Sequence, residues 1–381
     1  MMLTAVGLMS GTSLDGVDVA LIETDGKRVK SFGPSGYRAY TDQERGLLRQ
    51  ALTEAVNLSQ RNARPGILRE AERAVTQAHA EAVASFTAQH RITRENIDIV
   101  GFHGQTVLHR PAQKMTVQIG DAAALAKAIH IPVMYDFRAA DVEAGGQGAP
   151  FVPVYHRALA QSLEREGPIV VVNIGGVSNI TYIDGTDVLI ACDTGPGNAL
   201  IDDFMRARTG RPSDLHGRMG AGGTVADPFI ERVLADSFFA APPPKSLDRN
   251  AFSYQNIGLP ELSIADGAAT LAALTAAAVA RVIPHLPERP RSWIVGGGGA
   301  RNRTLMRMLA ERLAPASVET ADQVGWSADA LEAQAFAYLA VRTINGLPLT
   351  FPTTTGAPRP MPGGVIVHPE RSRPATAKGA A

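Results

Sequence analysis

The chain has 381 residues, a length typical of two or three domains or of one protein with two lobes and a cleft between them. Apolar residues make up 45% and charged residues 19%, which excludes a disordered or fibrous chain. Basic and acidic residues are equal at 37 each, so no net field attracts nucleic acid or an anionic membrane surface. We expect neither as a partner.

Three features bear on the compartment. The single Cys192 excludes an intrachain disulfide framework and fits a reducing environment. Residues 1–8 are apolar but lack the basic start and the cleavage site of a signal peptide. No segment reaches the roughly 18 uninterrupted apolar residues that a membrane span requires. We therefore expect a cytoplasmic protein.

Near the amino terminus, two apolar runs at residues 4–9 and 17–23 flank a Gly-rich segment at 10–16, which predicts a strand, a turn and a strand. Glycines let backbone N–H groups approach an anion, hydroxyls can donate to it, and a carboxylate can hold Mg²⁺ through water. A plain hairpin would use the same turn-forming residues. A Walker loop is disfavoured because its Gly-Lys-Ser/Thr ending is absent.

Helical and strand patterns alternate through the middle of the first half. Apolar residues at spacings of three and four predict a core-facing helix over 67–89. Residues 115–119, 122–129 and 131–135 then predict a strand, a helix and a strand. This order favours a parallel sheet with helices on its faces.

Polar side chains follow the apolar strand predicted for residues 97–102. His103, Gln105 and Thr106 offer donors and acceptors suited to sugar hydroxyls. A lone histidine would more often be a satisfied core residue, but three polar residues at one strand end are hard to explain by packing. Zinc binding by His103 and the nearby His109 is disfavoured because no third ligand has the usual spacing.

A charged segment comes next. Asp136, Arg138 and Asp141 precede a glycine-rich stretch at 145–150. This combination suits a ligand contact beside a mobile loop, and ordinary surface ion pairs would use the same residues.

The second half repeats the glycine hairpin. Apolar runs at 169–173 and 180–183 flank a turn that contains Gly175 and Gly176, so the chain is predicted to hold two similar halves. Gly175 and Gly176 could bind one end of a triphosphate while the first glycine turn binds the other end. A bulge or bend in a sheet would also use glycines. Because the glycine hairpin occurs twice, we favour the ligand-binding interpretation.

Asp193 is the candidate catalytic base. It follows a strand predicted at 188–192 and precedes a glycine-flanked turn and a helix predicted at 198–208, where open α/β sheets place ligands. A helix N-cap is the structural alternative. Gly297 and Gly298 lie between a strand and a helix, where a nucleotide can approach bare backbone, or they form a flexible connector.

Together these segments resemble the anhydro-N-acetylmuramic acid kinase family, within the superfamily of sugar kinases, actin and heat-shock ATPase chaperones. The resemblance covers nearly the whole chain and runs through residues 9–18, 103–106, 118–121, 136–138, 145–150, 173–179, 193–198, 296–302 and 331–336. It implies an α/β, duplicated two-lobe actin-like ATPase (ribonuclease H-like) fold with an interlobe cleft. The expected lobes are 1–145, to which 345–370 could return, and 146–344, followed by a disordered tail at 371–381.

The resemblance also implies a reaction. An ATP-dependent kinase with Mg²⁺ would open the anhydro bridge of 1,6-anhydro-N-acetylmuramic acid with water and phosphorylate the sugar, in peptidoglycan recycling. Asp193 would be the base, and Asp15 would hold the metal through water. The implied sugar contacts are His103, Gln105, Arg138 and Glu332. The implied ATP contacts are Gly11, Thr12, Ser13, Leu14, Asp15, Gly16, Val17, Asp18, Gly175, Gly176, Gly297 and Gly298. A homodimer is expected.

Three alternatives remain open on the sequence. An ATP-driven switch or filament protein would share the two-lobed fold, which does not by itself identify function. A conventional sugar kinase would phosphorylate a free hydroxyl without opening a bridge. A catalytically inactive protein would bind wall fragments without turnover.

Overall fold

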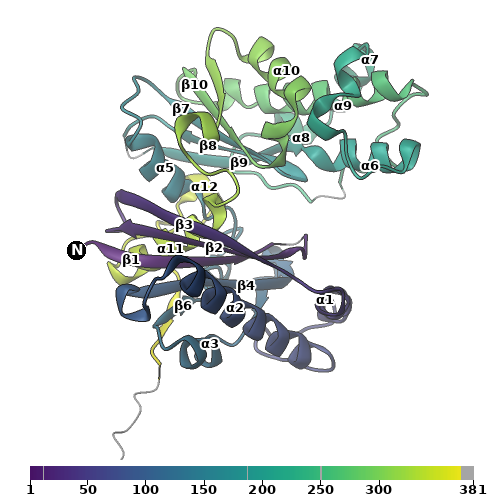
Figure 1. The fold of residues 1–381 in the computed structure, drawn as a ribbon. Coiled ribbons are helices and arrows are strands. Elements are labelled where there is room, and N and C mark those ends of the chain that lie inside the picture. Colours follow the sequence, from purple (N-terminus) through teal and green to yellow (C-terminus); the bar gives the residue numbers. More distant parts are fainter. Residues whose placement is uncertain (12, 187, 249–250, 370–381) are drawn as a thin grey trace, which may run out of the picture. The chain divides into compact units, whose positions relative to one another are not determined.

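A computed structural model describes residues 1–11, 13–186, 188–248 and 251–369. The chain forms two compact units (Figure 1). The first contains Met1–Ala140, Glu332–Leu347 and the segment that begins at Pro362, and the second contains Asp141–Leu331 and Pro348–Met361. The tail predicted at 371–381 lies outside the described residues.

The first unit is built on a seven-stranded sheet with a central path in the order β12-β6-β4-β1-β2-β3. An antiparallel meander, β1 to β3, is extended by β4 and β6, which run parallel to β1 and β4. β5 and β12 pair antiparallel with β4 and β6. The strands are β1 (Leu3–Ser10), β2 (Gly16–Thr24), β3 (Val29–Ala39), β4 (Ile99–Arg110), β5 (Met115–Ile119), β6 (Val133–Tyr135) and β12 (Val365–Val367).

Helices cover both faces of this sheet. Val6 and Leu8 of β1 share an apolar core with α1 (Asp42–Ala55), α2 (Leu68–His90) and α3 (Ala122–Ile129). Side chains alternate along a strand, so Gly7 faces the opposite side, where α11 (Leu331–Ile344) packs. The approach is close, because a Cβ at Gly7 would lie 1.7 Å from the Ala333 carbonyl oxygen.

This packing of α11 explains a difference from the predicted lobes, which assigned residues up to 344 to the second. Most of α11 belongs to the first unit because glycines on β1 and β4 leave room for its backbone. The change of unit near residue 140 falls within α4 (Ala139–Glu143).

The second unit has a five-stranded sheet in the order β11-β10-β7-β8-β9. β7 to β9 form an antiparallel meander, and β10 and β11 extend it in parallel, as β4 and β6 extend β1 to β3. The same order in both sheets confirms the predicted duplicated, ribonuclease H-like α/β fold. The strands are β7 (Ile169–Ile174), β8 (Val177–Ile183), β9 (Leu189–Pro196), β10 (Ser292–Gly296) and β11 (Ser317–Thr320).

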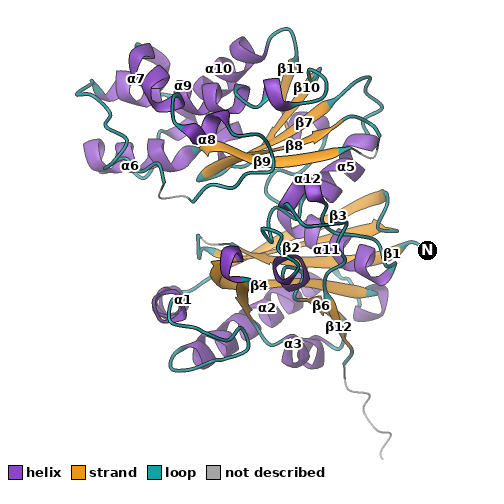
Figure 2. Cartoon of the chain, turned by 180° about the vertical axis from the view of Figure 1, so that it is seen from behind, coloured by secondary structure: helices purple, strands orange, loops and turns teal. Residues whose placement is uncertain are grey.

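Helices surround this second sheet as well (Figure 2). The largest core cluster joins β7 to β10 with α6, α7, α9 and α10. One stretch, Ile264–His285, is long and apolar enough to cross a membrane. However, 78% of its most apolar segment is buried inside the protein, as expected of a central core helix. The helices are α5 (Pro153–Gln161), α6 (Asn198–Thr209), α7 (Asp227–Leu234), α8 (Ser237–Ala240), α9 (Ile264–Ala280), α10 (Arg303–Leu313) and α12 (Pro352–Thr355).

Three local predictions need correction. β4 does not end at residue 102, because pairing with β1 and β5 continues to Arg110 and places His103 inside the strand. β9 likewise continues past 192 through pairing with β8, so Asp193 lies within it. β5 and β6 do not form a parallel pair, since each pairs with β4 and β5 is antiparallel to it.

Candidate functional site

The first glycine turn joins β1 to β2 in the first unit. The Ser13 hydroxyl donates to Asp15 Oδ1 over 2.8 Å, and the Gly16 N–H donates to the same oxygen over 3.0 Å. Leu14 is buried with a left-handed φ of 57°, which anchors the turn, while Ser13 and Asp15 stay exposed. The turn therefore presents a hydroxyl and a carboxylate to solvent. Thr12 lies outside the described residues.

The Gln105 side chain holds the first glycine turn in place. Ser10, at the end of β1, donates its hydroxyl to Gln105 Oε1 over 2.6 Å, and Gln105 Nε2 donates to the Gly11 carbonyl over 3.1 Å. Tyr40 OH lies 2.9 Å from Ser10 Oγ, and burial raises the pKa of Tyr40 to about 12, so it remains a donor. Gln105 is buried and bonded at both ends of its amide, so it positions the turn here. Its sugar contact stays a prediction.

His103 and Arg138 form a directed pair. Arg138 Nε donates to His103 Nε2 over 3.1 Å, and His103 Nδ1 lies 2.7 Å from the Gly104 carbonyl oxygen. Burial, reinforced by the Arg138 charge, holds the pKa of His103 well below its ordinary value. The ring is therefore neutral, and its partners assign the proton to Nδ1.

Glu332, in the first turn of α11, completes this group. Although the side chain retains contact with solvent, the surrounding protein raises its pKa, and the positive charge of Arg138 opposes that rise. The charge of Asp15 adds to the rise. Glu332 thus lies within electrostatic reach of Arg138 and the first glycine turn, so the unit brings predicted sugar contacts and predicted ATP contacts together.

The second glycine turn, between β7 and β8, lies against the start of α6. Gly197 N–H donates to the Gly176 carbonyl over 2.9 Å, and Asn198 N–H donates to the Gly175 carbonyl over 2.7 Å. Asn198 also donates its side-chain amide to the Ile174 carbonyl over 3.0 Å. Helix α6 thereby fixes the turn, a role of Asn198 that the sequence alone did not indicate.

Gly297 and Gly298 converge on the same place. Gly297 has φ +73°, and a Cβ there would lie 2.4 Å from Asn173 Oδ1, so only glycine fits. A Cβ at Gly298 would lie 3.3 Å from the Asn198 amide nitrogen. An open cavity of about 260 Å³ begins at this point, with walls that include Asn198, Ser213, Asp214, His216, Gly298 and Arg301.

Asp193 lies beside a β-bulge in β9. Asn179 pairs with Asp193 while Ser178 pairs with Gly195, which leaves Thr194 as the extra residue. Such bulges re-aim side chains next to active sites. The N-cap of α6 is Gly197, so Asp193 does not cap that helix.

The surroundings of Asp193 favour a base. Asp193 Oδ2 accepts from the Leu247 N–H over 2.7 Å, and burial raises the pKa of Asp193 to about 6 while that bond opposes the rise. The Lys245 ammonium instead donates to the Phe238 carbonyl over 2.8 Å and lies over the Phe238 ring. A carboxylate that titrates near neutral pH suits proton transfer. No sequence pattern pointed to Leu247.

A magnesium ion would fit the first turn only as a partly hydrated ion. Within the described ranges, no group of three His, Cys, Asp or Glu side chains could hold a metal. Mg²⁺ commonly keeps several waters and is bound by one or two carboxylates together with substrate phosphates. Asp15 supplies one exposed carboxylate whose two hydrogen bonds both go to Oδ1. The donor set therefore fits Mg²⁺ carried by a nucleotide.

Comparisons with known proteins agree along nearly the whole chain. The family model described as Anhydro-N-acetylmuramic acid kinase matches residues 3–369. The anhydro-N-acetylmuramic acid kinase of Bradyrhizobium diazoefficiens is 72% identical over 369 residues, covering 97% of this chain and 100% of the relative. That of Rhodopseudomonas palustris strain BisB18 is 69% identical, covering 96% and 100%. That of Methylobacterium nodulans is 55% identical over the same shares.

Proposed function

Because this chain belongs to the anhydro-N-acetylmuramic acid kinase family, we propose that it opens the bridge of 1,6-anhydro-N-acetylmuramic acid and phosphorylates the sugar with ATP. Membership makes it an enzyme of the kinase class. Water adds to the anomeric carbon, the bond from that carbon to O6 breaks, and O6 takes the γ-phosphoryl group. The products are N-acetylmuramic acid 6-phosphate and ADP. The observation that carries the proposal is the half-buried carboxylate of Asp193, which lies beside the β-bulge in β9 and is held by the Leu247 N–H at one oxygen only.

In this reaction Asp193 takes a proton from the attacking water. Its pKa of about 6 leaves it mostly ionised at neutral pH, yet basic enough to bind the proton as the new bond forms. The Leu247 N–H occupies Oδ2, so Oδ1 is the oxygen that receives the proton. Phosphoryl transfer otherwise needs positioning and charge neutralisation more than covalent chemistry.

The glycine turns would bind the nucleotide. The turn after β1 would supply donors for phosphates once the Ser13 hydroxyl turns from Asp15 to the ligand, and the glycine turn between β7 and β8 would supply the rest. The cavity beyond Gly298 has walls of mixed polar and apolar character and open space for the nucleoside end. Bound Mg²⁺ would neutralise negative charge on the phosphates, and Asp15 would hold it through water.

His103, Arg138 and Glu332 would contact the sugar. Arg138 is tied to a neutral His103, so these side chains present donors and acceptors in a fixed arrangement. The partners of the protein would be an amino sugar, water and a second copy of the chain in a homodimer. A cytoplasmic site of action, where ATP is available, suits the recycling of peptidoglycan fragments.

Product analysis tests the function. The protein is incubated with Mg-ATP and 1,6-anhydro-N-acetylmuramic acid in oxygen-18 water. The mass of the product is then measured by mass spectrometry, before its anomeric oxygen exchanges with solvent. We expect a product that has gained one phosphoryl group and one labelled water. A conventional sugar kinase would add phosphate without water. A switch or an inactive binding protein would give no sugar phosphate, and either result would contradict the proposal.

The pH dependence of the rate tests the base. Because burial raises the pKa of Asp193 to about 6, protonation below that pH removes the proton acceptor. We expect kcat/KM to be level above pH 7 and to fall about tenfold per pH unit below 6. Steady-state rates between pH 4.5 and 8.5 check this, with nucleotide binding measured in parallel. A plateau that continues down to pH 4.5 would assign the base to another group.

A further inference from the structure

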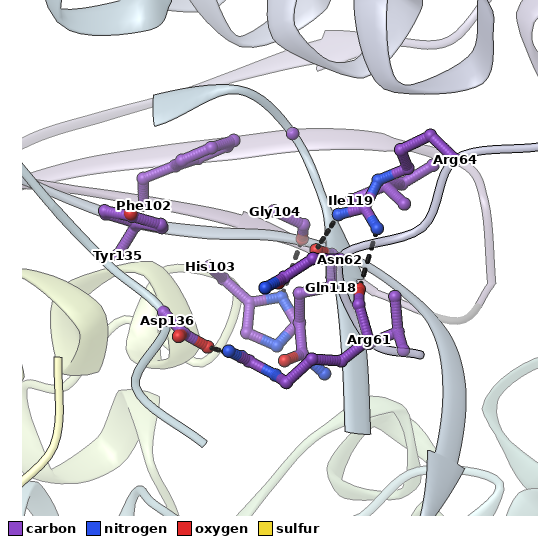
Figure 3. A pocket seen from close by; sticks show the side chains of 12 residues that line it. Arg61, Asn62, Arg64, Phe102, His103, Gly104, Gln118, Ile119, Tyr135 and Asp136 are labelled. Atoms are coloured by element: carbon purple, nitrogen blue, oxygen red, sulfur yellow. Dashed lines mark hydrogen bonds and ion pairs between the residues drawn. The ribbon is translucent and has the colours of Figure 1, made fainter. Parts of the chain in front are cut away.

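A second polar cavity, of about 220 Å³, lies wholly within the first unit (Figure 3). Its walls come from the segment before α2, from β4 and β5, and from the end of β6. The charged and polar side chains in its walls include Arg61, Arg64, His103, Gln118 and Asp136. His103 connects this cavity to the proposed sugar contacts, because the Nε2 atom of the same ring is bound by Arg138.

The two arginines in the wall differ in how much of the guanidinium is engaged. Arg64 donates to Glu72 over 2.7 Å, to the Arg61 carbonyl over 2.8 Å and to the Ala63 carbonyl over 3.0 Å, so it holds the segment in place. Arg61 is bound only through Nη2, which pairs with Asp136 Oδ1. Within the described part of the chain, its Nε and Nη1 donors have no partner, and about a third of its side chain is exposed.

Two further observations mark the cavity as a ligand site. Asp136, the partner of Arg61, has a left-handed φ of 58°, a conformation that is uncommon outside glycine and gathers at ligand and active sites. The side-chain oxygen of Gln118 is buried without a hydrogen-bond partner in the described structure. A buried orphan acceptor is rare, and because Gln118 lines the cavity, a rotation of its side chain would bring this oxygen to a ligand hydroxyl or amide N–H.

We propose that this cavity binds the carboxylate-bearing substituent of the acceptor sugar, and that Arg61 is the residue that selects for it. The inference rests on the proposed function, whose substrate carries a lactyl ether that the corresponding anhydro-N-acetylglucosamine lacks. A guanidinium can form two parallel bonds with one carboxylate through neighbouring N–H groups, and either Nε or Nη1 of Arg61 can form such a pair with the second N–H of Nη2 while the first stays on Asp136. Asp136 orients the side chain, and Arg64 fixes the backbone beneath it.

The test compares two substrates in the full-length protein. We expect the wild type to prefer 1,6-anhydro-N-acetylmuramic acid over 1,6-anhydro-N-acetylglucosamine by at least tenfold in kcat/KM. In Arg61→Ala, kcat/KM for the acidic sugar should fall by about 10- to 100-fold, mainly through KM, and that for the neutral sugar by less than threefold. Arg61→Lys should recover part of the preference. Arg73→Ala, an exposed arginine on α2 outside the cavity, is the charge-matched control.

Asp136→Asn is expected to change KM for the acidic sugar in the opposite direction. Asparagine tolerates a left-handed backbone, so the fold is retained while the competing carboxylate is removed. KM for the acidic sugar should fall by about two- to fivefold, with little change for the neutral sugar. An equal loss for both sugars in Arg61→Ala, or an unchanged preference, would overturn the assignment.

Binding measurements separate this inference from the proposed reaction. If the wild type converts neither anhydro sugar, the proposed function fails. Calorimetry with N-acetylmuramic acid and N-acetylglucosamine then still tests the cavity. Tighter binding of the acid that is lost in Arg61→Ala supports the carboxylate site, and equal or undetectable binding of the two sugars overturns it.

Discussion

Replacement of Asp193 by asparagine is expected to lower kcat by about 10² to 10⁴-fold while nucleotide affinity stays within about twofold. Asparagine has nearly the same shape, and its side-chain oxygen can still accept from the Leu247 N–H that now binds Oδ2. Only the capacity to take a proton is lost. Single-turnover kinetics with the anhydro sugar would measure the chemical step, and calorimetry with ADP would measure the affinity.

The same variant should be at least as stable as the wild type, which distinguishes lost chemistry from lost folding. Burial raises the pKa of Asp193 to about 6, so the folded protein binds this proton more tightly than the unfolded chain does. Above pH 6 the ionised carboxylate therefore opposes folding. The variant should gain up to about 3 kcal/mol in free energy of unfolding at pH 8, and the gain should shrink as the pH falls from 6 toward 4.

Asp184→Asn is the matched control in the same unit. Asp184 lies in the turn between β8 and β9, where its Oδ1 accepts from Thr186, and asparagine can make the same bonds. Its turnover should be unchanged. If Asp193→Asn kept more than a tenth of wild-type kcat, or lost nucleotide affinity in parallel, Asp193 would not be the base.

The fold was predictable wherever short-range patterns determine it. Hydrophobic runs around two glycine turns indicated both hairpins, and the repetition indicated a duplicated sheet, which the shared strand order confirms. The ends of β4 and β9 were not predictable in the same way. The apolar runs end at residues 102 and 192, but pairing with neighbouring strands continues beyond them. Strand ends depend on partners that are distant in sequence.

The sequence indicated which residues belong to the site, but it did not indicate which of them contact one another. The motifs singled out His103, Arg138 and Glu332, yet their mutual arrangement depends on α11 returning to the first sheet from far along the chain. Leu247 binds Asp193 through a backbone N–H, which leaves no trace in side-chain chemistry. Arg61 stood in no recognisable motif, and only the cavity around it reveals a use.

Gly7→Ala is expected to be the most disruptive small substitution outside the reacting groups. The new Cβ would lie 1.7 Å from the Ala333 carbonyl oxygen and 2.7 Å from the Ala337 nitrogen, and both are backbone atoms of α11. No rotamer change can relieve such a clash, so the helix must move off the sheet. We expect a loss of about 3 kcal/mol or more in the free energy of unfolding, measured by urea denaturation.

Activity should fall with it, because α11 carries Glu332 immediately before Ala333. A displacement of about 1 Å at a substrate-positioning residue can cost about 10²-fold in rate, so we expect a comparable drop in kcat/KM under conditions where the variant remains folded. Gly46→Ala on α1 is the control: its Cβ would meet nothing within 4 Å. In a helix interior that change should stabilise by about 0.5–1 kcal/mol and leave activity intact. Equal stability of the two variants would show that α11 does not depend on the missing side chain at Gly7.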